Sequence, residues 1–375
     1  MTPTGPEFYR LLIAVMIITT FARGQQNNSW QEKPDLTLMG FADVFYVYDF
    51  NKPVGNARQP FLFNHNRHNE FNLNLGLVNL QLAQPKYRAS VALQAGTYAN
   101  DNYAAEPDLL KSIFEAYIGI SLNNDNSLWL DAGVLPSHLG FESAMSIDNP
   151  TLTRSLAAES SPYFLTGAKI TYTPSQKWEM AALVVNGWQR IQRVEGNSLP
   201  SFGTQLIYKP TERASINWST FIGTDDPDQI RRMRYFSNLY SQLSLSNKWS
   251  LTAGFDLGAQ QRSKGSSDYD LWMAPVVIGR YQINERWASA LRLEYYQDEK
   301  GVIIPTGTPN GFKTTGVSAN IDYSPVPFIA CRLEGRWFSS TDSVFETETD
   351  LTATNFFIGT SIAIKFAELL SKDVQ

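Results

Sequence analysis

Hydrophobic and polar residues alternate along most of the chain. In the clearest segment, every second position from Trp249 to Leu257 is apolar, and Ser, Thr, Gly and Asp fill the positions between them. This period of two predicts a β-strand with one apolar and one polar face. The segments 317–323 and 356–366 repeat the pattern, so we expect the chain to consist almost entirely of strands.

The alternation predicts sixteen strands. Two of the segments, 70–83 and 177–189, lose the alternation midway. A β-bulge in each would explain the loss, and barrels of fourteen or eighteen strands are the alternatives. The predicted strands lie near 36–50, 70–83, 87–99, 111–123, 127–135, 162–173, 177–189, 201–209, 213–223, 234–246, 248–262, 269–283, 286–298, 314–324, 327–340 and 353–366.

The connections between these segments alternate between short and long. Turns such as 84–86 and 124–126 are short, whereas the connections between them are longer, up to the loop 136–161. Outer-membrane barrels have short periplasmic turns and long external loops. Strands can cross hydrocarbon only as a closed barrel, because backbone polar groups find no water there. We therefore predict an all-β fold: a closed antiparallel transmembrane β-barrel over 36–366, with a periplasmic tail, 367–375.

Composition supports this class and excludes others. Charged residues make up 18% of the 375 residues, whereas about 25% is usual in soluble domains. No mature stretch reaches the ~20 apolar residues of a transmembrane helix, and a net charge of −5 offers no basic surface to nucleic acid. The one cysteine, Cys331, excludes a disulfide framework and falls on the predicted lipid-facing side of its strand.

The N-terminus predicts export. Arg10 precedes an apolar run over 11–21, and Ala22-Arg23-Gly24 places small residues where signal peptidase cleaves. We interpret 1–24 as a signal peptide and 25–35 as a periplasmic segment. The last predicted strand ends on Phe366 and looks like the assembly signal of outer-membrane barrels. The expected partners are therefore the outer-membrane assembly machinery, outer-membrane lipid and lipopolysaccharide.

Aromatic residues gather at the ends of the predicted strands, as the two membrane interfaces favour. They are Trp129, Tyr172, Trp178, Tyr208, Trp249, Tyr281, Trp287, Tyr323 and Phe366 near the short turns, and Tyr48, Tyr98, Trp188, Tyr235, Tyr296 and Trp337 near the long loops.

Several short motifs lie along the predicted barrel, among them Gly40-Phe41-Ala42-Asp43-Val44, Arg67-His68-Asn69-Glu70-Phe71-Asn72, Glu115-Ala116-Tyr117, Gly140-Phe141-Glu142-Ser143 and Glu294-Tyr295-Tyr296. Together they resemble the OmpL-like β-barrel porin family of Gram-negative outer membranes. The resemblance covers roughly 36–366. It implies an outer-membrane barrel that forms a pore, and it supplies no substrate.

The polar face of each strand is expected to line the lumen, because an Arg or Lys facing the bilayer midplane costs ~2–4 kcal/mol. Arg292, Arg332 and Arg336 are expected to form a basic ladder on one wall, either for conduction or for pairing with the neighbouring glutamates. The candidate pore-lining residues are Arg292, Glu294, Arg332, Glu334, Arg336, Asp256, Asp322, Glu115, Asp131 and Lys169.

The loop 136–161 is the longest connection. In general diffusion porins a long loop folds into the lumen and sets the constriction. By analogy, Glu142, Asp148, Arg154 and Glu159 are candidates for a constriction that faces the arginine wall. Opposed charges would produce a transverse field that selects solutes by charge and dipole. The alternative is an ordinary external loop.

The sequence gives little support to an enzyme. His65, His68 and His138 are the only histidines, and no spacing singles one out for a hydrolase or a metal site. We expect solvated loop histidines, no catalysis, no cofactor and no metal. The predicted function is passive diffusion of small hydrophilic solutes through a water-filled barrel with a charged constriction. The alternative is a non-conducting structural or adhesive barrel acting through its external loops, and an oligomer remains open.

Overall fold

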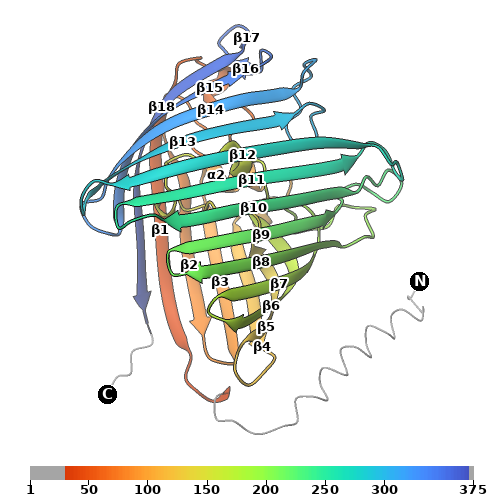
Figure 1. The fold of residues 1–375 in the computed structure, drawn as a ribbon, viewed down its shortest axis with the longest axis vertical. Helices are drawn as coiled ribbons and strands as arrows, with labels where there is room; N and C mark the ends of the chain where they lie inside the picture. Colours follow the sequence, from red (N-terminus) through yellow and green to blue (C-terminus); the bar gives the residue numbers. More distant parts are fainter. Residues whose placement is uncertain (1–29, 371–375) are drawn as a thin grey trace.

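Sixteen long antiparallel strands close into one barrel, as the alternation predicts. The computed structural model describes residues 30–370 (Figure 1). Successive strands pair with each other, and β18 (Thr354–Leu369) closes the barrel against β1 (Asp35–Asp49). The predicted signal peptide lies outside the described residues. Within 30–370, no helix is long and apolar enough to cross a membrane.

Each of the sixteen predicted segments corresponds to one strand of the barrel. The strands between β1 and β18 are β2 (Phe71–Ala83), β3 (Tyr87–Ala95), β4 (Ile113–Ser121), β5 (Leu128–Pro136), β6 (Phe164–Ser175), β7 (Trp178–Val185), β8 (Ser201–Thr211), β9 (Ala214–Gly223), β10 (Arg234–Ser244), β11 (Trp249–Gln261), β12 (Tyr269–Gln282), β13 (Trp287–Asp298), β14 (Phe312–Tyr323) and β15 (Ile329–Ser340). The long connections carry α2 (Thr97–Asn102), α3 (Asp108–Lys111), α4 (Leu156–Glu159), the 3-10 turns η2 (Val54–Asn56) and η3 (Ser146–Asp148), and a hairpin of β16 (Phe345–Glu346) and β17 (Leu351–Thr352).

The two irregular segments have different causes. In β2, Asp43 pairs with Leu75 and Val44 pairs with Leu73, so Asn74 is an extra, bulged residue. The bulge predicted in 70–83 is therefore confirmed. The bulge predicted in 177–189 is wrong, because β7 ends at Val185 and the residues after it belong to a loop.

The outer face is apolar and carries aromatic pairs at its short-turn end. Across neighbouring strands, Trp178 packs on Tyr208 and Trp249 on Tyr281, with ring centroids 4.3 and 4.6 Å apart. Cys331 is half-buried on this side of β15, between inward-facing neighbours. Three residues assigned from sequence to the long-loop girdle instead pack inside the barrel, namely Tyr98, Tyr296 and Trp188.

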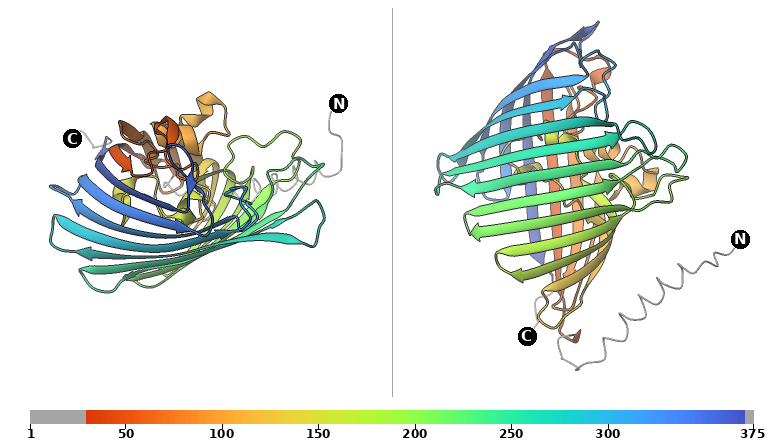
Figure 2. Two further views of the ribbon diagram at one scale, coloured as in Figure 1. Left: turned by 90° about the horizontal axis from the view of Figure 1, so that it is seen from above. Right: turned by 45° about the vertical axis from the view of Figure 1, so that its right-hand side comes forward.

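The interior holds an apolar core that the simple apolar-out pattern did not predict. On β12, the inward positions Trp272, Val276 and Ile278 are almost fully buried. They belong to one cluster with residues of the long connections, among them Phe61 and Leu156. Figure 2 shows the strands of the C-terminal two thirds as a curved wall whose concave side faces the N-terminal part of the chain. The long connections are therefore packed inside the barrel as well as outside it.

Candidate pore lining and internal loop

Four charged residues form a buried cluster on the inner wall. Arg292 and Glu294 project from β13, and Glu334 and Arg336 project from β15, so alternate positions on strands separated by β14 come together. Arg292 lies 2.8 Å from Glu334, and Arg336 lies 2.6 Å from Glu294. None of the four is more than 3% exposed. We call these four residues the wall cluster.

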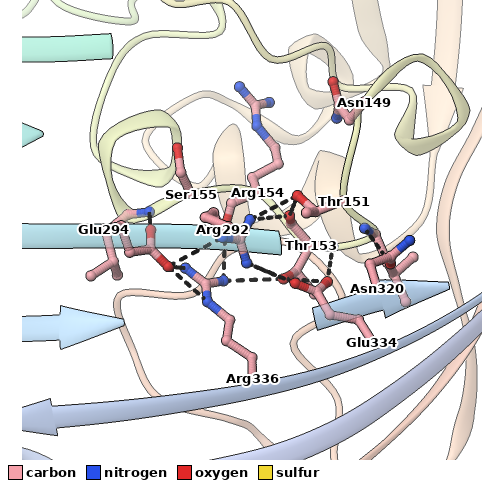
Figure 3. A network of polar contacts seen from close by, with 12 residues as sticks. Asn149, Thr151, Thr153, Arg154, Ser155, Arg292, Glu294, Asn320, Glu334 and Arg336 are labelled. Carbon is pink, nitrogen blue, oxygen red and sulfur yellow. Dashed lines mark hydrogen bonds and ion pairs between the residues drawn. The ribbon is translucent and has the colours of Figure 1, made fainter. Parts of the chain in front are cut away.

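The connection between β5 and β6, residues 137–163, binds this cluster through its backbone (Figure 3). We call this segment the internal loop. Glu334 accepts the Thr153 N–H at 2.6 Å, and Glu294 accepts the Leu156 N–H at 2.7 Å. In return, Arg292 donates to the Thr153 carbonyl at 2.6 Å and Arg336 to the Arg154 carbonyl at 2.8 Å. Such charge-assisted bonds are roughly twice as strong as neutral ones, so the wall cluster holds the loop in place.

A second group of wall residues binds the loop nearer the short turns. Arg332 donates to the Asn149 carbonyl at 3.0 Å and pairs with Asp322 at 2.8 Å. Arg280 bonds the same carboxylate at 2.7 Å and the Pro150 carbonyl at 3.1 Å. The three arginines of the predicted ladder therefore lie on one inner wall, and their guanidinium groups bind loop carbonyls and wall carboxylates.

The loop is also bound to the strands on the other side. The His138 carbonyl accepts from Gln205 on β8 at 3.0 Å and from Ser219 on β9 at 2.8 Å. Two residues further on, the Gly140 N–H donates to Asn238 on β10 at 3.1 Å. Because the same segment is bound to β8–β10 and to β12–β15, it crosses the lumen.

Two glycines make room for the loop. A Cβ on Gly203 of β8 would lie 2.7 Å from the His138 ring, and a Cβ on Gly254 of β11 would lie 2.8 Å from Phe141. Both distances are below van der Waals contact. Glycine inside a strand marks a close approach of another group. These two inward glycines are therefore a signal in the sequence for docking of the loop, and no prediction was drawn from them.

The four candidate constriction residues are distributed around the loop and do not face the arginines together. Glu142 accepts the Ser155 N–H and hydroxyl within the loop. Asp148 pairs with Lys365 at 2.7 Å. Arg154 stacks over the Tyr163 ring. Glu159 accepts hydrogen bonds from the connection between β1 and β2, residues 50–70, which we call the first loop. The donors are the Phe63 N–H and the Asn64 Nδ2, both at 3.0 Å. Their role in selecting solutes stays a prediction.

The remaining candidates occupy three inner-wall positions. Asp131 pairs with Arg88 at 2.7 Å, and half-exposed Lys169 lies opposite it on β6. Glu115 is buried and accepts from Asn79 at 2.9 Å. Asp256 is buried and accepts from Asn238. Of the ten candidate pore-lining residues, only Lys169 is more than slightly exposed, and passage of solute along them stays a prediction.

The expectation of solvated histidines is wrong. His65, His68 and His138 are between 1% and 6% exposed, because the loops that carry them fold inward. His65 Nε2 lies 2.9 Å from Asp43 on β1, and His68 Nδ1 accepts the Asp49 N–H at 3.0 Å. The bulged Asn74 also binds the first loop, since it accepts the His65 N–H at 2.9 Å. Within 30–370, no group of three potential metal ligands is formed.

The burial of His138 predicts that acid releases the internal loop. Desolvation lowers the pKa of its imidazole from 6.5 to about 4, and the hydrogen bond to the Thr220 carbonyl offsets part of the shift. Between pH 4 and pH 6.5, the His138 imidazole therefore binds more protons when the loop is undocked than when it is docked. The contribution of neutral His138 to the free energy of docking is therefore fully present above pH 6.5. It falls by up to about 3 kcal/mol as the pH drops from 6.5 to 4.

We expect trypsin to cleave after Arg154 faster at pH 5 than at pH 7.5, relative to a flexible peptide at each pH, and His138→Gln to reduce this difference. The variant comparison is needed because burial raises the pKa of Glu159, which acts in the opposite direction. Equal pH dependence in both proteins would contradict the assignment to His138.

A cavity of about 780 Å³ opens at the short-turn end of the barrel, directly beneath the internal loop. Phe141 and Asp148 of the loop contribute to its wall on one side, and Arg280 of β12 lies beside them. The turns after β6, β8 and β10 surround it, with Lys177, Lys209, Glu212 and Arg213 among the lining residues. The cavity is therefore an open vestibule that leads to the internal loop.

A closed sixteen-stranded barrel with an apolar outer face and a long loop crossing its interior defines the class of outer-membrane porins. The family described as Putative beta-barrel porin-2, OmpL-like, matches residues 35–366. The chain belongs to this family, as the motifs in its sequence indicate. No curated protein matches the chain in sequence.

Solved porin structures share the fold at low sequence identity. The outer membrane channel DcaP of Acinetobacter baumannii superposes with a TM-score of 0.61 at 14% identity, covering 92% of this chain and 99% of that one. An anion-selective porin from Comamonas acidovorans gives 0.61 at 8% identity, covering 89% and 100%. OmpT of Vibrio cholerae in its trimer form gives 0.60 at 8%, also covering 89% and 100%. These likenesses establish the fold.

Proposed function

We propose that the protein is a passive, non-enzymatic channel in the outer membrane for small hydrophilic solutes, with the internal loop as its constriction. The observation that carries the proposal is a loop bound to opposite inner walls of a sixteen-stranded barrel. Sixteen strands leave an aqueous lumen unless loops fill it. A bound loop reduces that lumen to a narrow passage and thereby sets the size limit.

The wall cluster then positions the loop and does not touch solute. Its four side chains are buried and already paired, so they have no free charge to offer. Charge selection falls to residues that keep contact with solvent beside the loop, chiefly Lys169 and Arg88, whose partner Asp131 is buried.

A second candidate function is a non-conducting structural or adhesive barrel. The observation in its favour is the apolar packing of the internal loop and the first loop, residues 50–70, against inward side chains such as Phe45 and Phe312. If this packing closes the lumen, only the external loops remain for binding partners.

Single-channel recording in planar bilayers decides between the two. The channel proposal predicts discrete conductance steps from the refolded, heat-modifiable barrel in symmetric KCl. A correctly folded barrel that produces no steps would contradict the channel and favour the structural or adhesive function. Boiled protein serves as the control for detergent artefacts.

The family and fold support an outer-membrane location. We further propose export through a signal peptide at 1–24, periplasmic segments at 25–35 and 367–375, and contact with lipopolysaccharide and the assembly machinery. Because a V. cholerae relative was solved as a trimer, we propose an oligomer here as well. Crosslinking of unboiled outer membranes would reveal its size, and a monomer alone would contradict it.

A further inference from the structure

The vestibule beneath the internal loop carries unneutralised positive charge. Lys177, Lys209 and Arg213 line it and are exposed. Within 30–370, no ion pair joins any of these three side chains to a carboxylate, and Arg213 bonds only the Asn247 amide oxygen, at 3.2 Å. They come from the end of β8 and from the turns after β6 and β8, which places them on neighbouring parts of the rim.

The acidic groups near the vestibule do not cancel this charge. Asp148 is neutralised by Lys365, and the buried Asp322 pairs with Arg280 and Arg332. Glu212 is the one lining carboxylate without an ion pair among the described residues. Three free cations therefore face one free lining carboxylate.

The charge of the rim also differs from that of the whole chain. The seven short turns that connect β2 to β3, β4 to β5 and so on to β14 and β15 hold five basic and three acidic residues. The chain as a whole carries a net charge of −5. The short turns therefore carry a net positive charge in a chain that is acidic overall. In porin barrels the short turns face the periplasm.

We propose that this vestibule is a binding region for small hydrophilic anions bearing carboxylate or phosphate groups, and that it gives the channel an anion preference set from the short-turn end. Its volume of about 780 Å³ lies in the range of small-molecule sites, roughly 300–1,000 Å³. A cleft with walls of low dielectric constant focuses the field of its charges and raises the local concentration of the opposite ion. The selectivity part of this proposal rests on the proposed channel function, whereas the binding part does not.

The first experiment measures the reversal potential in a KCl gradient. We expect anion preference in the unaltered protein and its loss or inversion in Lys177→Glu/Lys209→Glu/Arg213→Glu. Because salt screens charges over ~10 Å at 0.1 M and ~3 Å at 1 M, the preference should be larger when the dilute solution bathes the short-turn end. Arg193→Glu/Lys264→Glu/Lys300→Glu, on exposed loops at the other end of the barrel, changes the net charge by the same amount and is the control.

A conducting channel without anion preference, or one that the triple variant leaves unchanged, would overturn the inference and leave the channel function standing.

The second experiment needs no conductance. In a Cys331→Ala background, Ser215→Cys places a thiol in the vestibule wall. Relative to the rate of each reagent with a small free thiol, anionic methanethiosulfonate should label it several-fold faster than a cationic analogue, inorganic phosphate should slow the anionic reagent, and the triple charge reversal should invert the ratio. Equal normalised rates for both reagents would overturn the binding proposal even if the barrel conducts nothing.

Discussion

Replacing residues 139–160 by a short glycine–serine linker is expected to raise single-channel conductance several-fold. The replacement removes the contacts with Asn238, Glu294 and Glu334 that hold the loop across the lumen. Without the internal loop, the lumen is bounded there only by the sixteen-stranded barrel, which is wide enough for an aqueous channel. The measurement is the conductance of single channels in symmetric KCl, with heat-modifiability as the check of folding.

The matched control replaces residues 263–267 by the same linker. These residues form the exposed loop between β11 and β12, so conductance should not change. If removal of the internal loop also leaves conductance unchanged, the loop does not define the narrowest part of the passage.

The second large effect is expected from Glu334→Ala. This change removes the nearer of the two carboxylates paired with Arg292, and the acceptor for both the N–H and the hydroxyl of Thr153. The buried wall cluster then holds two arginines and one glutamate. Leaving one charge of a buried pair without its partner costs ~3–5 kcal/mol. The loop can avoid that cost only by undocking, so the expected readout is rapid tryptic cleavage after Arg154 together with noisier, larger conductance.

Three further variants separate this mechanism from general destabilisation. Glu334→Gln keeps an acceptor for Thr153 and should have an intermediate effect. Arg292→Ala/Glu334→Ala removes both charges and should cost less than the sum of the single changes, because the two residues interact directly. Glu299→Ala breaks an exposed ion pair with Lys313 and should be neutral. Protease resistance equal to that of the unaltered protein in Glu334→Ala would contradict the role of the wall cluster.

The wall of the barrel was predictable from sequence because it obeys a short-range rule. Each strand has to present apolar residues to lipid at every second position, so segments such as 249–260 are visible without knowledge of their neighbours. The bulge at Asn74 was visible for the same reason, as a local failure of the rule. By contrast, the end of β7 at Val185 was missed because both faces of this strand are apolar from Met180 onward, so the alternation is lost before the strand ends.

The interior was less predictable because it depends on contacts between distant segments. Nothing near Trp272 or His65 in sequence indicates that a loop will cover them, and His65 was expected to be solvated, whereas both side chains are buried. The pairing of Arg292 with a neighbouring glutamate was foreseen as one alternative, but its contact with the Thr153 carbonyl, 139 positions away, was not. Only the glycines at 203 and 254 offered a local signal of that docking.

The closure of β1 against β18 has a consequence for the order of folding. Their pairing runs from Thr37 with Leu369 to Asp49 with Phe357, so it joins the two ends of the chain. Contacts of such large sequence separation form late, because chain entropy must be lost before they contribute. Lys365 on β18 contacts Asp148 of the internal loop, and Asn355 contacts Asp49 across the junction. We therefore expect the internal loop to dock inside the barrel before β1 and β18 pair, so that the last strands to join form their hydrogen bonds around a loop that is already bound.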